Sequence, residues 1–443
     1  MSFVAHTLQQ LHAIPTGPVV YGKVQAVVGL LIEASGLDAA VGELCYIHER
    51  VGGRRLKAEV VGVRSGTTVL MPLEETHGLR AGCLIECSRL PLTVRVGQAL
   101  LGRVIDANGR PLDGKGPLAL MAEQPVHREP PSPLDRQTIH EPLATGVRAI
   151  DAFLTIGKGQ RIGIFAGSGV GKSTLLGMIA REAKADVNVI ALIGERGREV
   201  REFIDDNLGE EDLARSVVIA VTGDQAAMSR VKGASVALAV AEHFRDEGKD
   251  VLLMMDSVTR VAMAQREIGL AVGEPPTTRG YTPSVFALLP RLLERAGPGA
   301  TGTITGIFTV LVDGDDMNEP IGDAARGILD GHIVLSRKLA HANHFPAIDV
   351  PGSVSRVMNR VASAEALAAA DEARRLLGAH RKVEDLLRIG AYERGQDPLT
   401  DRALAAHGAL TEFLQQGVHE PIDPDPVGTL RALLATIPTP PTR

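Results

Sequence analysis

The sequence predicts an α/β core with a mostly parallel sheet, preceded by a small N-terminal β-barrel and followed by a helical C-terminal domain. Short β-rich runs broken by glycine fill the first part of the chain. Near-continuous apolar runs then alternate with amphipathic segments, and the residues after about 360 are rich in Ala and Leu without β-branched runs. The length of 443 residues is enough for two or three domains at roughly 150 residues each.

The N-terminal part predicts a short helix followed by a barrel. Residues 1–18 carry three aliphatic side chains at helical spacing before a proline, and we expect them to form a docking helix: Val4, Leu8 and Leu11. Residues 19–96 contain short strand-like runs at close intervals, which are typical of a small barrel: VVYGKVQAVVGLLIEA, AEVVGVRS, TTVLMPL and CLIECS.

Residues 97–360 predict the α/β domain. A proline-rich stretch that ends at Arg136, EQPVHREPPSPLDR, is expected to be an extended connector. Beyond it, buried-type strands are predicted at 161–165, 187–193, 216–221 and 251–255. Helices are predicted between them at 172–184, through REVREFIDDNL, and at about 226–247. This alternation favours a parallel sheet that is covered by helices on both faces.

Residues 361–443 are predicted to form a helical domain.

The composition of the whole chain disfavours several classes of protein. A net charge of −6 is too close to balance for a protein whose surface coats nucleic acid. With no Trp, 4 Tyr and 9 Phe, carbohydrate binding and base stacking are disfavoured. No apolar run approaches the roughly 20 residues of a spanning helix. The three cysteines form no CxxC pair and are expected to be reduced thiols, so we expect a soluble, cytosolic protein: Cys45, Cys83 and Cys87.

The strongest motif is AGSGVGKST, which follows the predicted strand 161–165 and opens a helix. It fits the phosphate-loop pattern except that its first residue is alanine where the strict form has glycine. The glycines let backbone N–H groups turn inward as an anion nest, while the lysine provides a charge for phosphates and the serine a hydroxyl for Mg²⁺. The candidate phosphate-binding residues are therefore Ala166, Gly167, Ser168, Gly169, Val170, Gly171, Lys172, Ser173 and Thr174.

The apolar run VLLMMD ends in Asp256. An acid at the carboxyl end of a parallel strand is where the shell of Mg²⁺ needs a carboxylate. A strand-ending Asp on its own is more often a cap or a turn former. A phosphate loop about 85 residues upstream, expected on a neighbouring strand, favours the metal-binding interpretation.

Glu195 lies in GERGREVREF, directly after the predicted strand 187–193, and is therefore expected at the same edge of the sheet as Lys172 and Asp256. A carboxylate there can orient and polarise a water for in-line attack on a γ-phosphate. The alternative is that Glu195 pairs with Arg196 or Arg198 in a solvated charge cluster. The spacing alone does not decide between the two.

Six longer segments carry a resemblance to a known family, which the chain matches from about residue 20 to its end. They are TGVRAID, FAGSGVGKST, GERGREVREF, MDSVTRVAMAQREIG, GEPPTTRGYTPSVFALLPRLLERAG and LDGHIVLSRKLA. The chain resembles the type III secretion ATPases, relatives of the catalytic subunits of rotary ATP synthases. GYTPSVF, FTVLVDGDD and GEPPTTRG look more like the flagellar branch than the virulence-injectisome branch. The resemblance implies a RecA-like P-loop core that hydrolyses ATP with Mg²⁺.

The resemblance also implies roles for individual residues. Lys172 and Ser173 match the phosphate-loop lysine and the Mg²⁺-binding hydroxyl, and Asp256 matches the acid that holds the Mg²⁺ water shell. Glu195 matches the catalytic carboxylate. In HFPAIDVPGSVSR, Arg356 matches an arginine finger that reaches the site of the neighbouring subunit, and Phe345 matches an aromatic that stacks on adenine. The alternative for Phe345 is ordinary core packing.

Family members are similar in forming a hexameric ring with ATP sites between subunits. The resemblance therefore implies a homo-hexamer at the cytoplasmic base of the export gate, peripherally associated with the inner membrane. It implies as partners a stator-like negative regulator, export-gate membrane proteins and complexes of export chaperones with their substrates, with no nucleic acid. The function implied is ATP hydrolysis that energises or assists the export of unfolded proteins through a flagellar apparatus.

The chain departs from the rotary synthases in two places. Where their catalytic subunits carry an acidic loop that meets the rotor, this chain has AYERGQDP, with two acids and one Arg. Near Phe413 and Val418, where synthases place an aromatic residue against adenine, the chain is mostly aliphatic and polar. The first departure disfavours an ATP-synthase function.

Two other classes remain as alternatives. A ring RNA translocase shares the core and the small barrel, but residues 1–100 hold 9 basic and 8 acidic residues and three aromatics. Single-strand binding calls for basic grooves and stacking platforms, so this balance disfavours it. The other alternative is a non-catalytic ring subunit, which could do without the carboxylate at Glu195.

Deletion of residues 1–18 tests the docking-helix hypothesis. If the segment docks a stator-like partner and does not pack on the barrel, the shortened chain should keep nearly the same melting temperature and lose co-purification with that partner. A large fall in melting temperature would instead mean that the segment is structural.

Overall fold

The computed structural model describes residues 21–49, 53–119, 122–312, 314 and 316–438. The predicted docking helix, residues 1–18, lies outside these ranges. The chain divides into two compact units, Met1–Leu92 and Thr93–Arg443.

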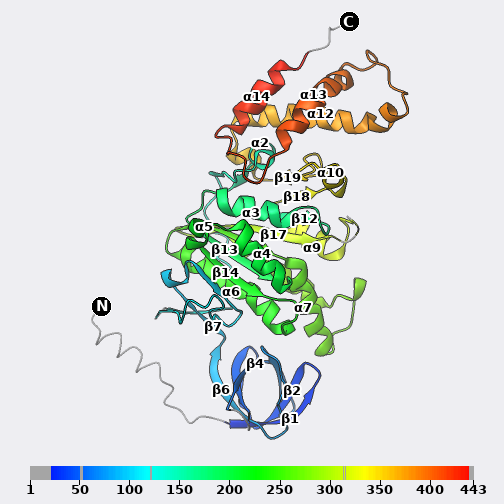
Figure 1. The fold of residues 1–443 in the computed structure, drawn as a ribbon. Helices are drawn as coiled ribbons and strands as arrows, with labels where there is room; N and C mark the ends of the chain where they lie inside the picture. Colours follow the sequence, from blue (N-terminus) through cyan, green and yellow to red (C-terminus); the bar gives the residue numbers. More distant parts are fainter. Residues whose placement is uncertain (1–20, 50–52, 120–121, 313, 315, 439–443) are drawn as a thin grey trace, which may run out of the picture. The chain divides into compact units, whose positions relative to one another are not determined.

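The first unit contains a closed antiparallel barrel of six strands, as the sequence predicts (Figure 1). Its strands are β1 (Tyr21–Val28), β2 (Leu31–Ser35), β3 (Glu43–His48), β4 (Arg55–Arg64), β5 (Thr67–Pro72) and β6 (Leu84–Pro91), in the order β1-β2-β5-β4-β3-β6. Alternate residues point inward and form a separate apolar core that includes Val24, Ile32, Ile47, Leu70 and Ile85.

The boundary predicted at residue 96 differs from the division that the structure makes after Leu92. The strand β7 (Thr93–Val96) pairs with β9 (Ala122–Pro125) in the second unit and has no place in the barrel. Its buried residues, Val94 and Val96, alternate with more exposed ones, as in any strand with one buried face. This local pattern predicts a strand but does not tell which strand it pairs with.

The second unit is organised around a nine-stranded, mostly parallel sheet with the order β19-β18-β12-β17-β15-β13-β14-β8, in which β16 also pairs with β17. The strands are β8 (Arg103–Ile105), β12 (Arg161–Ala166), β13 (Val187–Ile193), β14 (Ser216–Val221), β15 (Asp250–Asp256), β16 (Gly297–Pro298), β17 (Thr303–Leu311), β18 (Gly331–Leu335) and β19 (Val354–Ser355). Every residue of β13 and β14 is buried, which explains their continuous apolar runs. β17 lies between β12 and β15, so the strands that carry the phosphate loop and Asp256 are not direct neighbours, contrary to the prediction.

Helices cover both faces of the sheet (Figure 1). The buried face of α3 packs in one core cluster with Ile190 and Leu192 of β13. On the other face, Gly233 of α6 lies against Ile193 and Val221, where a Cβ would come within 3.0 Å of both side chains. The helices before the C-terminal domain are α2 (Arg148–Phe153), α3 (Lys172–Glu182), α4 (Gly197–Asn207), α5 (Glu210–Ala214), α6 (Ala227–Asp246), α7 (Val258–Ala271), α8 (Pro283–Leu293), α9 (Pro320–Ile328), α10 (Arg337–His341) and α11 (Met358–Val361).

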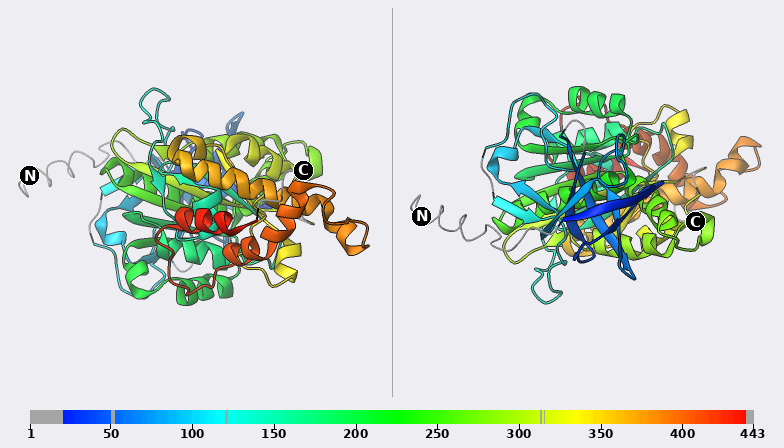
Figure 2. Two further views of the ribbon diagram at one scale, coloured as in Figure 1. Left: turned by 90° about the horizontal axis from the view of Figure 1, so that it is seen from above. Right: turned by 90° about the horizontal axis from the view of Figure 1, so that it is seen from below.

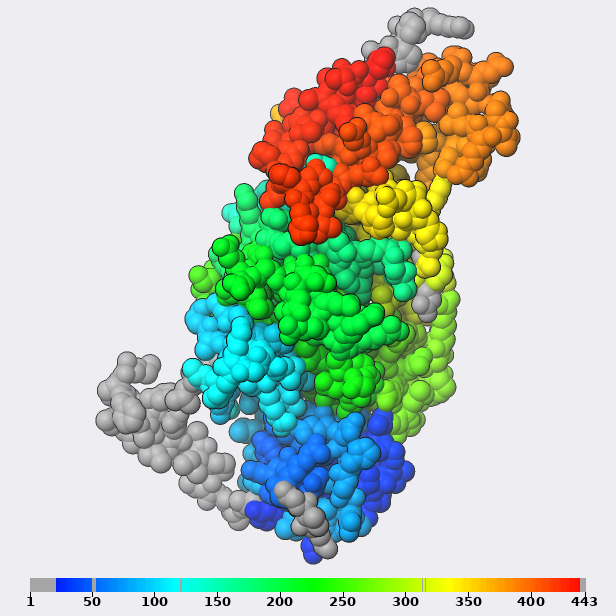
Figure 3. Space-filling model, viewed as in Figure 1, coloured from blue at the N-terminus to red at the C-terminus, as the bar shows by residue number. Residues whose placement is uncertain are grey.

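The C-terminal residues form the predicted helical domain, with α12 (Ala364–Arg388), α13 (Pro398–Leu414) and α14 (Pro426–Thr436). α12 and α13 lie side by side (Figure 2). The ring of His380 on α12 stacks on that of His407 on α13. The helical domain shares one apolar core with the sheet. On the surface, it lies against the segment around β18 and α10 (Figure 3). Phe413 packs edge-on against Phe153 of α2 with ring centroids 6.2 Å apart. Within the described residues, no helix combines the length and the apolar character that crossing a membrane requires.

A buried ion pair joins α6 to the segment that follows α8. Arg295 donates to the carboxylate of Glu242 through Nε at 2.8 Å and Nη2 at 2.9 Å, and its Nη1 donates to the Val126 carbonyl at 3.0 Å. The side chains of Arg295 and Glu242 are only 4% and 1% exposed. Because Val126 belongs to the predicted connector, Arg295 links the connector to α6 through its side chain.

Replacing Arg295 with Met should destabilise the chain by about 3–5 kcal/mol, because the buried Glu242 carboxylate then keeps only the half-exposed Arg128, 3.9 Å away, as an ion-pair partner. The double variant Arg295→Met, Glu242→Leu should recover a large part of that loss, since no buried charge remains. Urea unfolding followed by circular dichroism measures both. A double variant as unstable as the single one would contradict this account.

Candidate active site

The phosphate loop joins β12 to α3. Gly169 and Gly171 have φ of 77° and 88°, the left-handed conformation that glycine adopts without strain. Ala166 is the last residue of β12, paired with Leu311 and Leu335, and its φ is not positive. The first position of the motif therefore does not need glycine here. The loop ends at the N-terminus of α3, where N–H groups and the helix dipole favour an anion.

The structure brings together the three predicted charged residues at the carboxyl edge of the sheet. Lys172 Nζ lies 2.5 Å from Asp256 Oδ1 and 3.5 Å from Glu195 Oε1. Thr309, on the intervening strand β17, donates its hydroxyl to Asp256 Oδ1 at 2.7 Å. All three charged side chains are largely buried, and the hydroxyl and the ammonium both donate to Oδ1 of the Asp256 carboxylate. The alternative for Glu195, pairing with Arg196 or Arg198, is not what the structure contains: those arginines pair with Glu199 and Glu202.

Burial raises the pKa of Glu195 to about 7; the Lys172 ammonium opposes this rise and the Asp256 carboxylate adds to it. A general base works best when its pKa lies close to the working pH. A partly buried carboxylate at this edge, beside the phosphate loop, can therefore accept a proton from a water at neutral pH.

Besides Arg196, three arginines that the sequence analysis did not single out line the same cavity of about 650 Å³ as the phosphate loop: Arg260, Arg266 and Arg279. Arg260 lies in the first turn of α7, four residues after Asp256, and its buried Nε has no hydrogen-bond partner in the part of the chain that the structure describes. The signal was available in the segment MDSVTR, because a cation one turn after a strand-ending acid must lie near the same edge. A guanidinium there can bind phosphate oxygens in a bidentate manner.

A smaller apolar cavity of about 320 Å³ adjoins the loop and is lined by Leu175 and Met178 of α3, Phe345 and the segment Gln416–Val418. The Phe345 side chain is 41% exposed, so ordinary core packing does not account for it. Its ring lies 3.4 Å from the point where a Cβ on Gly171 would be. An aromatic face beside the phosphate loop can stack on a nucleobase.

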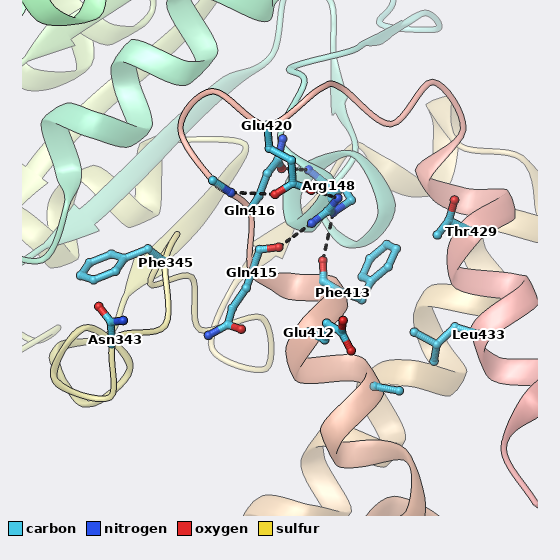
Figure 4. Close-up of a pocket in the computed structure, with 12 residues that line it drawn as sticks. Arg148, Asn343, Phe345, Glu412, Phe413, Gln415, Gln416, Glu420, Thr429 and Leu433 are labelled. Carbon is cyan, nitrogen blue, oxygen red and sulfur yellow. Dashed lines mark hydrogen bonds and ion pairs between the residues drawn. The ribbon is translucent and has the colours of Figure 1, made fainter.

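Phe345 and Gln416 also line an adjoining pocket of about 760 Å³, in which hydrogen bonds join residues far apart in the sequence (Figure 4). The Gln416 backbone N–H donates to the Phe345 carbonyl at 2.9 Å, and the Gln416 amide donates to Gly146 O at 2.8 Å and accepts from Arg148 N at 2.9 Å. The Arg148 guanidinium donates to the carbonyls of Phe413 and Gln415 and pairs with Glu420. Sequence reasoning missed Arg148 and Gln416, because no local pattern connects positions 268 residues apart.

Arg356 does not join this cluster. It is exposed after β19, where its N–H donates to Asp330 O at 3.0 Å and its Nη2 donates to Arg326 O at 3.3 Å. It does not line the cavity that contains Lys172 and Glu195. Within one chain, therefore, the guanidinium of Arg356 and the phosphate loop are separate.

Three family models match the chain. The "ATP synthase alpha/beta family, beta-barrel domain" matches residues 24–89, the "ATP synthase alpha/beta family, nucleotide-binding domain" residues 146–355, and the "T3SS EscN ATPase C-terminal domain" residues 362–433. The nucleotide-binding model thus covers the phosphate loop, Glu195 and Asp256.

Curated relatives match over nearly the whole chain. The flagellum-specific ATP synthase of Bacillus subtilis is 56% identical over 404 residues, covering 90% of this chain and 92% of that protein. The type 3 secretion system ATPase of Xanthomonas euvesicatoria is 51% identical, covering 89% and 90%.

A solved structure of the assembled ATPase EscN, from the type III secretion system of enteropathogenic E. coli, superimposes with a TM-score of 0.88 at 47% identity. The match covers 93% of this chain and 100% of that one. Barrel, nucleotide-binding sheet and helical domain therefore all have counterparts, and the chain belongs to the ATP synthase α/β family, among the flagellum-specific and type III secretion ATPases.

Proposed function

We propose that the protein is an ATP hydrolase that energises or assists the export of unfolded proteins through a flagellar type III secretion apparatus. The observation that carries the chemistry is the convergence of Lys172, Glu195 and Asp256 beside the glycine nest. Identity of 56% to a flagellum-specific ATP synthase supports the flagellar assignment. The injectisome alternative has support from the 51% identity to the Xanthomonas ATPase.

In the proposed reaction, water attacks the γ-phosphorus of ATP and the bond to the ADP oxygen breaks, giving ADP and phosphate. The loop amides of residues 166–174 and the Lys172 ammonium bind the phosphates, and Phe345 stacks on adenine. Glu195 orients the attacking water and accepts its proton. Arg260, which lines the same cavity, binds γ-phosphate oxygens.

The residues present fit a Mg²⁺ ion, because the Ser173 hydroxyl and the Asp256 carboxylate are hard oxygen ligands beside the phosphate nest. Ser173 would bind the ion directly and Asp256 would hold its water shell. When bound, the ion neutralises charge on the phosphate oxygens. Lys172 would then exchange part of its contact with Asp256 for the phosphates.

We propose further that the working protein is a homo-hexameric ring at the cytoplasmic face of the inner membrane, in which Arg356 acts as a finger in the site of the adjacent subunit. Its exposure, away from its own phosphate loop, supports a role in trans. A solved complex of EscN with its central stalk EscO supports a stalk partner. A stator-like regulator, export-gate proteins and chaperone–substrate complexes complete the proposed partners, and no nucleic acid is expected.

Glu195→Gln should bind nucleotide normally and lose turnover by roughly 10²–10⁴-fold, because the amide keeps the shape but cannot take a proton from water. Equilibrium binding of a fluorescent ATP analogue and phosphate release measure the two properties. Glu202→Gln is the matched control, because Glu202 lies on the exposed face of α4, pairs with Arg198 and does not line the cavity of the phosphate loop. Turnover retained in Glu195→Gln would remove Glu195 from its role.

Mixing two inactive variants tests Arg356. An Arg356→Ala subunit lacks the finger but keeps Glu195, whereas Glu195→Gln lacks the base but keeps the finger. An arginine finger supplied in trans is worth about 10³–10⁵ in rate, so each variant alone should be nearly inactive. Mixed rings should regain part of the activity at interfaces that join an intact Glu195 to an intact Arg356. No recovery in rings that native mass spectrometry shows to be mixed would argue that Arg356 does not act in trans.

A further inference from the structure

Arg374 of α12 reaches out of the helical domain to the chain segment that precedes Arg356. Its Nη1 donates to Val350 O at 3.2 Å and to Ser353 O at 3.1 Å, and its Nη2 donates to Phe153 O at 2.7 Å. One guanidinium thus contacts three backbone carbonyls from two separate segments. None of these contacts is with a carboxylate, so the side chain fixes backbone positions.

The same segment has further restraints. The Ser353 hydroxyl donates to Asp349 O at 2.6 Å and accepts from Val334 N of β18 at 2.9 Å. The Ser355 hydroxyl donates to Thr155 O at 2.9 Å. Arg381, seven residues and about two turns beyond Arg374, pairs with the Asp349 carboxylate at 3.1 Å. Two arginines on one face of α12 therefore hold residues 349–353, directly before β19, and Arg356 follows that strand.

We propose that Arg374 is a positioning residue that sets where Arg356 projects from its own subunit and thereby acts on the site of the neighbouring subunit. This inference rests on the proposed trans role of Arg356. Arg374 touches neither the phosphate loop nor the cavity that contains Glu195. Two of its three acceptors, Val350 O and Ser353 O, closely precede Arg356, so the proposed effect on the finger passes through the backbone of residues 350–355.

The geometry also explains why arginine stands at this position. Three acceptors in different directions suit the planar fork of a guanidinium, while a lysine ammonium offers a point charge on a flexible stem. Loss of the fork removes a donor from the carbonyls of three buried residues, of which Val350 keeps the Ser353 N–H at 3.2 Å. A displacement of the finger by about 1 Å can cost up to 10²-fold in rate.

The first arm of the experiment uses Arg374→Ala and Arg374→Lys in the full chain, with Arg375→Ala as the matched control. Arg375 is exposed on the same turn, and among the described residues its side chain has no hydrogen bond or ion pair. Arg374→Ala should lower kcat by roughly 10- to 100-fold with little change in KM for ATP, Arg374→Lys should be intermediate, and Arg375→Ala should match the parent. A rise in KM for ATP as large, in fold-change, as the fall in kcat would overturn the proposal.

The second arm assigns Arg374 to one of two complementation groups in mixed rings. Arg374→Ala mixed with Glu195→Gln should regain activity, because the Glu195→Gln subunits still carry a correctly placed finger. Arg374→Ala mixed with Arg356→Ala should regain none, because no subunit then presents one. This pattern would not arise from general destabilisation, which the melting temperature of each variant measures separately.

Two outcomes overturn the inference without touching the proposed function. Recovery with Arg356→Ala but not with Glu195→Gln would mean that Arg374 supports the site of its own subunit through Phe153. Recovery with neither, when Arg374→Lys behaves like Arg374→Ala and both melt early, would mean a structural role only. A fully active Arg356→Ala would instead refute the finger itself, and the Arg374 proposal with it.

Discussion

The placement of one ammonium between two carboxylates is the constraint on which the rest of the nucleotide-binding unit depends. Lys172, Glu195 and Asp256 follow three different strands, and like charges at this distance are tolerable only with a cation between them. The strands must therefore end in register at one edge, with β17 between β12 and β15. Thr309 of that strand supplies the remaining donor to Asp256, so even the intervening strand takes part in holding the charges.

The same arrangement accounts for the pKa of Glu195. Burial alone favours the neutral acid, and Asp256 reinforces that preference, while Lys172 opposes it. Because these opposing effects leave the pKa of Glu195 at about 7, the carboxylate gains or loses a proton easily near neutral pH. This suits a group that must take a proton from water and return it. A fully solvated glutamate at this edge would remain ionised and be a weaker base.

The sequence predicts those parts of the fold and site that a local pattern encodes. The phosphate loop is nine consecutive residues, and the ends of β13 and β15 follow from buried apolar runs, so Lys172, Glu195 and Asp256 could be placed at one edge. The pairing of β7 with β9 could not be predicted, because strand periodicity does not name a partner. The contacts of Arg148 with Gln416, and of Arg374 with Val350, likewise join segments that only the tertiary fold brings together.

The separation of Arg356 from the phosphate loop of its own chain has a consequence for cellular energy use. If the finger is supplied only by a neighbour, a free subunit can hold ATP but completes no catalytic site. ATP consumption in the cell then follows the number of assembled rings and not the number of chains synthesised. A pool of unassembled subunits could be maintained beside the export machinery without draining nucleotide, and assembly itself would be the step that starts hydrolysis.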